Sequence, residues 1–327
     1  MKKLFVLLLV AIVTLGLVAC ESPTTGTPSK SGGLITVGFA QCKADESDWR
    51  KANTNSVQQA LSKENGFDLI LADSNNDAAK QVSDVQGFID QEVDYIIIAA
   101  VNVDGWDTVL KNAKDAGIPV ILMDRTINAS DELYECWLGS DFYGEGVKAT
   151  EWMKKRFSGG TPANIVHLQG QLGASAQVGR TEALEDAITA NGWTLLAQQT
   201  GDWSTDTAKE IMSSWIQQFG SDITCVYAEN DNMADGAIQA LEEAGMKAGG
   251  DDGVAIISFD ANRAYLQMTL EGKINCNVEC NPLHGPKVAE IIKNMESGGK
   301  PSKTETVEES AFFYDTITQE IIDARQY

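Results

Sequence analysis

Short apolar runs recur along the chain, and each is followed by a polar loop and then by a stretch with apolar residues at helical spacing. The runs do not alternate between apolar and polar residues, which is typical of strands in a parallel sheet covered on both faces. The expected strands form two series, Ile35–Ala40, Leu69–Ala72, Tyr95–Ala100, Pro119–Met123 and Trp137–Gly139, then Ile165–Leu168, Trp193–Ala197, Ile223–Ala228, Val254–Phe259 and Asn275–Glu279.

Helical patterns separate these strands, for example at Ala78–Gln91, Trp106–Ala116, Glu145–Phe157 and Met233–Ala244. Gly117 and Gly245 follow two of the patterns as helix stops. Strands that alternate with helices in this way predict a doubly wound α/β architecture. Because the series divides near Gly139–Gly144 into two similar halves, we expect two such lobes rather than one long sheet.

The first residues have the pattern of an export signal. Lys2 and Lys3 precede an apolar run from Leu4 to Val18, which is shorter than the roughly 20 residues needed to span a membrane. The ending Leu17-Val18-Ala19-Cys20 resembles a bacterial lipobox, in which the cysteine becomes the lipidated first residue. We therefore expect a lipoprotein signal peptide over residues 1–20, a flexible Ser/Thr/Gly/Pro-containing tether over 21–33, and an extracytoplasmic protein anchored to the cell membrane at Cys20.

The charge and the number of cysteines argue against several kinds of partner and site. The 327-residue chain has 47 acidic and 25 basic residues, a net charge of −22, so we expect no nucleic-acid partner. After Cys20 five cysteines remain, an odd number that argues against a fully paired disulfide framework. Cys276 and Cys280 would need a further pair to hold a metal, and His284 is the only candidate nearby. We expect buried free thiols, no metal and no cofactor.

The carboxyl ends of the expected strands carry polar side chains that could bind a ligand, because open α/β sheets bind ligands in the crevice beyond those ends. Carboxylate and guanidinium groups suit bidentate hydrogen bonds to vicinal hydroxyls, and indole faces cover the apolar faces of a sugar ring. The set contains neither a nucleophile–base pair nor a phosphate loop. Its members are Gln41, Asp73, Asn102, Asp124, Arg125, Ser140, Asp141, Gln169, Glu229, Asn230, Asp231 and Asp260, with Trp49, Arg50, Arg180, Trp203 and Glu279 in nearby loops or just beyond strands.

From about Ile35 to its C-terminus, the chain resembles the type I periplasmic sugar-binding proteins of ATP-binding-cassette importers, in particular the ribose-binding group. Within that group it is most similar to galactofuranose-binding proteins, through Ser47-Asp48-Trp49-Arg50, Asp104-Gly105-Trp106, residues 168–175 and Val278-Glu279. The segments that carry the family resemblance are Ala72–Asp77, Gly117–Val120, Met123–Arg125, Ala228–Met233 with Gly236-Ala237, and Phe259-Asp260.

The resemblance implies a hinged, two-lobe fold. The N-terminal lobe would hold residues 34–139 and 280–309, and the C-terminal lobe residues 140–279 and 310–327. Three crossovers would join the lobes, near Ser140–Asp141, Glu279–Cys280 and Glu309. Closure about this hinge would bury the sugar and create the surface that the importer recognises.

The resemblance also implies a ligand set. Asp124 and Arg125 would grip ring hydroxyls from the first lobe, with Trp49 and Arg50 in place of the aromatic pair of ribose binders. Arg180, Asn230 and Asp260 would bind from the second lobe, and Trp203 would stack on the ring. Glu279 stands where ribose binders carry glutamine, so Glu279 and Arg50 add charge and argue against ribose. Ser140 completes the expected set.

Simpler interpretations exist for several of these residues. Asp124 and Arg125 could form only a surface ion pair, although their position in a family motif favours a ligand role. Asp73–Asp77 carries oxygen-bearing side chains at the first ligand positions of an EF-hand calcium loop. Ala78 occupies the position where that loop needs glycine, so a turn with a helix N-cap is favoured. Of Asn230 and Asp231, we expect one to cap a helix while Asn230 faces the sugar.

We therefore expect a monomeric binding protein, not an enzyme, that captures a monosaccharide and delivers it to the permease of an importer. A furanose-form hexose such as galactofuranose, or a related pentose or hexose, is the expected ligand. One alternative is a sugar-sensing subunit that docks on a chemoreceptor or sensor kinase. Another is an exported glycosidase, which would need a carboxylate pair at a separation of about 5–10 Å that no recognisable motif here provides.

Overall fold

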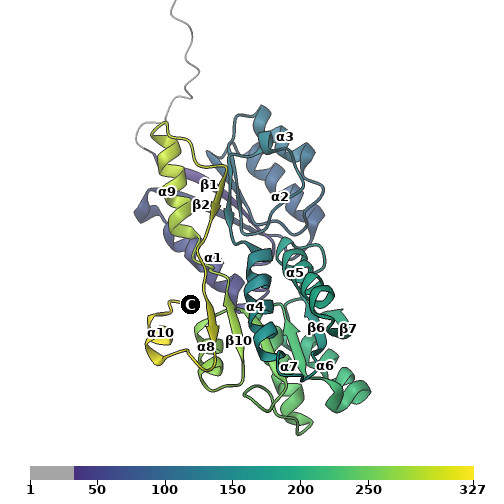
Figure 1. Cartoon of the computed structure of the whole chain (residues 1–327). Coiled ribbons are helices and arrows are strands. Elements are labelled where there is room, and N and C mark those ends of the chain that lie inside the picture. Colours follow the sequence, from purple (N-terminus) through teal and green to yellow (C-terminus); the bar gives the residue numbers. More distant parts are fainter. Residues whose placement is uncertain (1–32) are drawn as a thin grey trace, which may run out of the picture. The chain divides into compact units, whose positions relative to one another are not determined.

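The computed structural model describes residues 33–327 (Figure 1). The expected signal peptide, the lipidation site Cys20 and nearly all of the expected tether lie outside the described residues. None of the helices within 33–327 combines the length and the apolar character needed to cross a membrane.

The first six-stranded sheet is parallel throughout, with the strand order β11-β5-β4-β3-β1-β2. Its strands are β1 (Ile35–Gln41), β2 (Phe67–Asp73), β3 (Tyr95–Ile98), β4 (Val120–Met123), β5 (Cys136–Gly139) and β11 (Thr304–Thr306). Side chains alternate across it: Ile97 of β3 packs in one hydrophobic cluster, whereas Ile96 and Ile98 pack in another on the opposite face.

The second sheet also has six strands, in the order β12-β10-β9-β8-β6-β7. Its strands are β6 (Asn164–Gln169), β7 (Thr194–Thr200), β8 (Cys225–Ala228), β9 (Ala255–Asp260), β10 (Cys276–Glu279) and β12 (Ala311–Phe313). All neighbouring strands pair in parallel except β12, which lies antiparallel to β10 at the edge.

Helices cover both faces of each sheet (Figure 1). On the first sheet, α1 (Asp48–Ala60) and α9 (Gly285–Glu296) pack on one face, and α2 (Ala78–Asp90) and α3 (Asp107–Asp115) on the other. On the second sheet, α4 (Phe142–Arg156) and α5 (Ser175–Asn191) pack on one face, and α6 (Thr205–Phe219) and α7 (Asp231–Glu243) on the other. The remaining helices are α8 (Arg263–Leu270), α10 (Gln319–Ala324) and the short 3₁₀ segments Lys63–Asn65, Asp131–Leu133 and Gly220–Asp222.

The predicted fold class of two parallel-sheet α/β lobes is confirmed, and each expected strand is present. The expected loop setting of Trp49 and Arg50 is wrong, because both lie in the first turn of α1, whose N-cap Ser47 accepts a hydrogen bond from the Arg50 amide. Arg180 likewise lies within α5 and not in a loop. The turn at 73–77 is confirmed, since Asp77 caps α2 by accepting from the Lys80 amide at 2.9 Å.

The chain passes between the two sheets three times. It leaves the first sheet after β5, returns to it after β10, and leaves it again between β11 and β12. We retain the lobe limits 34–139 with 280–309, and 140–279 with 310–327, as a proposal.

Two helix glycines should respond to alanine in opposite ways. A Cβ at Gly236 in α7 would lie 2.2 Å from the Thr205 carbonyl oxygen of α6, whereas a Cβ at Gly87 in α2 would meet no atom within 4 Å. Gly236→Ala should lower the free energy of unfolding by roughly 1–3 kcal/mol through overpacking. Gly87→Ala should raise it by roughly 0.5–1 kcal/mol, because alanine has less backbone freedom to lose. Urea unfolding of both variants measures this, and changes of the same sign would contradict the tight contact between α6 and α7.

Candidate functional site

The carboxyl ends of both sheets face a common cavity. It is lined by charged, aromatic and small side chains that come from widely separated parts of the chain, as expected where open α/β sheets bind ligands. The lining residues are Glu46, Ser47, Trp49, Arg50, Asp124, Arg125, Phe142, Ala176, Arg180, Trp203, Asn230, Asp260 and Cys280.

Most of the residues expected to bind ligand line this cavity, but Ser140 and Glu279 do not. Ser140 Oγ donates to Glu309 Oε1 at 2.7 Å, in one of the segments between the sheets. The Glu279 carboxylate bonds to Arg325 and to the Tyr327 hydroxyl of the C-terminal segment. Successive side chains of a strand point to opposite sides, so the next residue, Cys280, takes the cavity position that we expected for Glu279.

A buried ion-pair network forms the part of the cavity next to the first sheet. Arg50 Nη2 lies 2.6 Å from Asp124 Oδ2, and Glu46 Oε1 lies 2.7 Å from Arg125 Nη2 and 3.2 Å from Arg50 Nε. Burial alone would raise the pKa of Glu46 and of Asp124, but the two guanidiniums outweigh it and hold both pKa values below the usual range. Both carboxylates are therefore charged at neutral pH.

Glu46 was not among the residues that we expected at the ligand site. This residue lies in the loop between β1 and α1, and its only sequence signal is its position four residues before Arg50. Its carboxylate bridges Arg50 and Arg125, so it positions both guanidiniums at the cavity.

Arg180 dominates the part of the cavity next to the second sheet. Its Nε lies 2.7 Å from Glu145 Oε2, its Nη1 donates to the Glu229 carbonyl at 2.5 Å, and its Nη2 lies 3.9 Å from Asp260 Oδ1. Burial raises the pKa of Asp260 well above its usual value, although the Arg180 charge opposes the shift. Asp260 Oδ2 and Trp203 Nε1 are buried and have no hydrogen-bond partner among the described residues. Both atoms are thus free to bond a hydroxyl in the cavity.

The backbone is strained where three lining residues enter the cavity. Asp124, Trp203 and Asp260 have φ angles of 64°, 63° and 99°, in a region that L-residues rarely adopt. Backbone strain of this kind persists only where the surroundings hold it, and it is concentrated at functional sites. At Asp124 the holding contacts are its amide to Leu138 O at 2.8 Å and Trp137 Nε1 to its carbonyl at 3.0 Å.

Asn230 lines the cavity and is also the N-cap of α7, where its Oδ1 accepts from the Met233 amide at 2.9 Å. Asp231 is buried deeper and accepts from Ser258 Oγ at 2.6 Å and Asn277 Nδ2 at 2.7 Å. Asn230 therefore both caps α7 and lines the cavity, whereas Asp231 joins α7 to β9 and β10.

The prediction of buried free thiols is confirmed for the five cysteines of the described residues, Cys42, Cys136, Cys225, Cys276 and Cys280. Cys280 is the only one of these five that lines the cavity. Its carbonyl accepts from Trp49 Nε1 at 2.6 Å, which holds the indole beside the second crossing between the sheets.

A sequence model of the family described as "Periplasmic binding protein domain" matches residues 37–291. Galactofuranose-binding protein YtfQ of Escherichia coli (strain K12) is 37% identical over 292 residues, which cover 88% of this chain and 90% of that protein.

Two solved structures also match this fold. One is a Mycobacterium smegmatis protein in complex with β-D-fucofuranose, with a TM-score of 0.81 and 37% identity, covering 86% of this chain and 92% of that one. The other is the periplasmic binding protein of the arabinose ABC transporter from Shewanella sp. ANA-3, bound to α- and β-L-arabinofuranose. It has a TM-score of 0.83 and 34% identity, covering 89% of this chain and 95% of that one.

The buried imidazole of His284 should make the folded protein less stable in acid. Its ring is buried edge-on to Trp49, with centroids 5.9 Å apart, and burial lowers its pKa to about 4. The unfolded chain binds this proton at a pH near 6.5, so stability is lost as the pH falls from about 6.5 towards 4. By pH 4.5, protonation of His284 should lower the free energy of unfolding by about 2–3 kcal/mol relative to neutral pH.

Urea unfolding of the wild type and of His284→Gln at pH 7 and pH 4.5 measures this contribution. The wild type should lose more stability between the two pH values than the variant. Equal losses would show that the imidazole does not titrate in this range.

Proposed function

Since the chain belongs to the periplasmic binding protein domain family, whose members bind solutes and are not enzymes, we propose that it captures a monosaccharide outside the cytoplasm and delivers it to an ABC importer. The sugar would be a furanose, in the class of galactofuranose, fucofuranose or arabinofuranose. A signal peptide over residues 1–20 and a lipid anchor at Cys20 belong to the same proposal, on the sequence pattern described above.

The observation that carries this proposal is the pairing of every arginine in the cavity. Arg50 is paired with Asp124 at 2.6 Å, Arg125 with Glu46 at 2.7 Å, and Arg180 with Glu145 at 2.7 Å. Each guanidinium already has a buried counter-ion, so the cavity favours a neutral ligand with many hydroxyl groups over an anion. The indoles of Trp49 and Trp203 add apolar faces suited to the C–H faces of a sugar ring.

The relatives support a furanose ring as the ligand. The names of three similar proteins, given above, each include a furanose. Their sugars differ in substituents but share the five-membered ring, which is why we propose the ring form as the common element of recognition.

Contacts between elements of the two sheets support capture by closure. Asp48 at the start of α1 accepts hydrogen bonds from Asn232 Nδ2 of α7 and Tyr265 OH of α8, at 3.2 and 3.3 Å. Elsewhere the Thr126 amide donates to Ser175 Oγ at 3.0 Å. Such contacts require the two lobes to lie close together, so they would stabilise a closed state around the ligand.

A panel of monosaccharides tests the proposed ligand class. D-Galactose and L-arabinose should raise the melting temperature of the purified protein by several degrees through their furanose fractions. D-Ribose also has a furanose fraction but should not raise it, because the charged Arg50 lines the cavity where ribose binders carry an aromatic residue. Ligand at a hundred times its dissociation constant contributes about 2.7 kcal/mol. No shift with any sugar, together with no sugar found by mass spectrometry of the denatured protein, would contradict the proposal.

Replacing one cavity arginine tests the site itself. Arg125→Ala should weaken sugar binding by roughly 2–4 kcal/mol, because it removes charge-assisted hydrogen bonds from a desolvated site. Isothermal titration with a sugar that binds the wild type measures the change. Arg263→Ala is the matched control, since the Arg263 side chain is 57% exposed and lies outside the cavity. Equal affinities of Arg125→Ala and the control would place the sugar elsewhere.

A further inference from the structure

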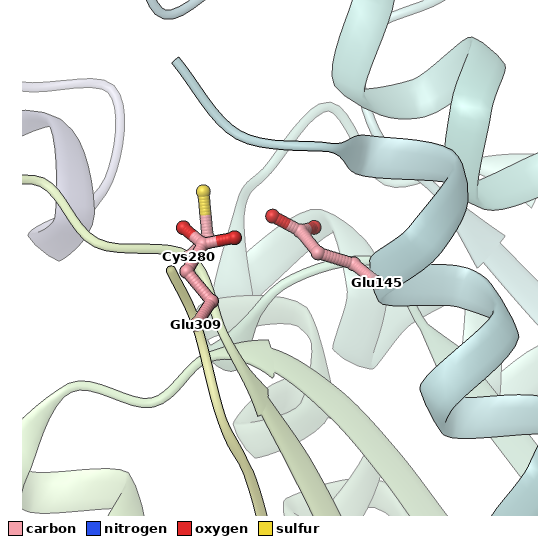
Figure 2. A group of neighbouring side chains, drawn as sticks. All are labelled: Glu145, Cys280 and Glu309. Atoms are coloured by element: carbon pink, nitrogen blue, oxygen red, sulfur yellow. The ribbon is translucent and has the colours of Figure 1, made fainter. Parts of the chain in front are cut away.

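Three side chains that could bind a metal ion meet where the chain crosses between the sheets. They are Glu145 of α4, Cys280 directly after β10, and Glu309 between β11 and β12. One possible ligand atom from each lies within 4.8 Å of those of the other two. Figure 2 shows the Glu145 carboxylate pointing toward the Glu309 carboxylate and the Cys280 thiol. The group draws on three segments that are far apart in the sequence.

The Glu145 carboxylate provides independent support for a bound cation. The residue is fully buried, and its Oε2 is paired with Arg180 at 2.7 Å. Its Oε1 is also buried but has no hydrogen-bond partner among the described residues. Leaving a carboxylate oxygen buried and unpartnered is costly, and a positive charge within the cluster would remove that cost.

The cluster has only one positive charge close to its three ligand groups among the described residues. Arg180 is paired with Glu145, and Lys148 Nζ reaches the main-chain carbonyl of Glu309 at 2.8 Å, not its carboxylate. Glu309 Oε1 accepts from the neutral Ser140 hydroxyl and Asn281 amide, each at 2.7 Å. Two carboxyl groups and a thiol thus share a single guanidinium.

We propose that Glu145, Cys280 and Glu309 bind a thiophilic divalent cation of the Zn²⁺ class. Carboxylates and a thiolate are ligands that zinc accepts, at about 2.0–2.2 Å for oxygen and 2.3 Å for sulfur. Tetrahedral bonds of these lengths hold ligand atoms roughly 3.3–3.7 Å apart, so atoms that lie up to 4.8 Å from one another would draw closer as the ion binds. The sulfur ligand disfavours Mg²⁺ and Ca²⁺, which prefer oxygen. Binding replaces the thiol proton of Cys280 by the metal, and it likewise displaces the proton that buried Glu309 holds near neutral pH, so both protons are released to solvent.

The cavity lies beside the site, so a water molecule there would be the fourth ligand of the ion. Three protein ligands leave one position of a tetrahedral ion open. Cys280 also lines the cavity, and Glu145 holds the cavity residue Arg180. The open position would take a water molecule on the cavity side. The ion would therefore lie between the hinge segments and the cavity.

Titration of the full chain with Co²⁺ tests the site, because a cobalt–thiolate bond produces a charge-transfer band in the near ultraviolet. One equivalent of Co²⁺ should produce the band, and Zn²⁺ should abolish it by competition. Cys280→Ser should lack the band. Glu309→Gln should weaken Co²⁺ binding by about tenfold or more. Glu308→Gln is the matched control, since the neighbouring Glu308 is exposed, and it should bind Co²⁺ like the wild type.

Urea unfolding and near-ultraviolet circular dichroism show whether each variant is folded. If Cys280→Ser does not fold, Glu309→Gln and its control decide the question. Absence of the band in the wild type, its persistence in folded Cys280→Ser, or equal affinities of Glu309→Gln and Glu308→Gln would each overturn the proposal. The titration contains no sugar, so its failure would leave the proposed sugar site untouched.

Discussion

Burying an arginine without a counter-ion costs several kcal/mol, and this chain buries three of them around one cavity. Each arginine is at most 3% exposed, and each is paired with a carboxylate that is itself buried. Removing any one carboxylate would leave an uncompensated charge in a desolvated site. The pairs therefore hold the loop after β1, α1 and the end of β4 together in the first lobe, and α4 to α5 in the second.

The sheets meet that constraint through the carboxyl ends of their strands. Parallel pairing brings the ends of β1 and β4 to one edge of the first sheet, and those of β8 and β9 to one edge of the second. Left-handed backbone at Asp124 and Asp260 then redirects the chain at the ends of β4 and β9. The backbone can hold these conformations because β4 and β9, from which they emerge, are fully buried and closely packed, so regular structure maintains the irregular site.

Apolar runs predicted the ten longer strands, and central strands such as β3 and β4 gave the clearest runs because every residue in them is buried. β11 and β12 left none, since each has three residues and neither is fully buried. Side-chain direction was harder to predict. The pattern could not show that Trp49 and Arg50 begin a helix, nor that Cys280 and not Glu279 faces the cavity. The role of Glu46 and the proximity of Glu145 to Glu309 arise from contacts between residues that are far apart in the sequence. The spacing of residues along the chain does not reveal such contacts.

The end of β10 shows how one residue step separates two roles. Glu279 turns away from the cavity and binds Arg325 and Tyr327, which anchors the C-terminal segment to the second sheet. Cys280 turns toward the cavity, and its carbonyl holds Trp49 of the first lobe. A shift of this strand by one residue would exchange the two, placing an unpaired carboxylate beside Trp49 and releasing the C-terminus. The register of β10 therefore links the C-terminal anchor, the crossing between the sheets and the chemistry of the cavity.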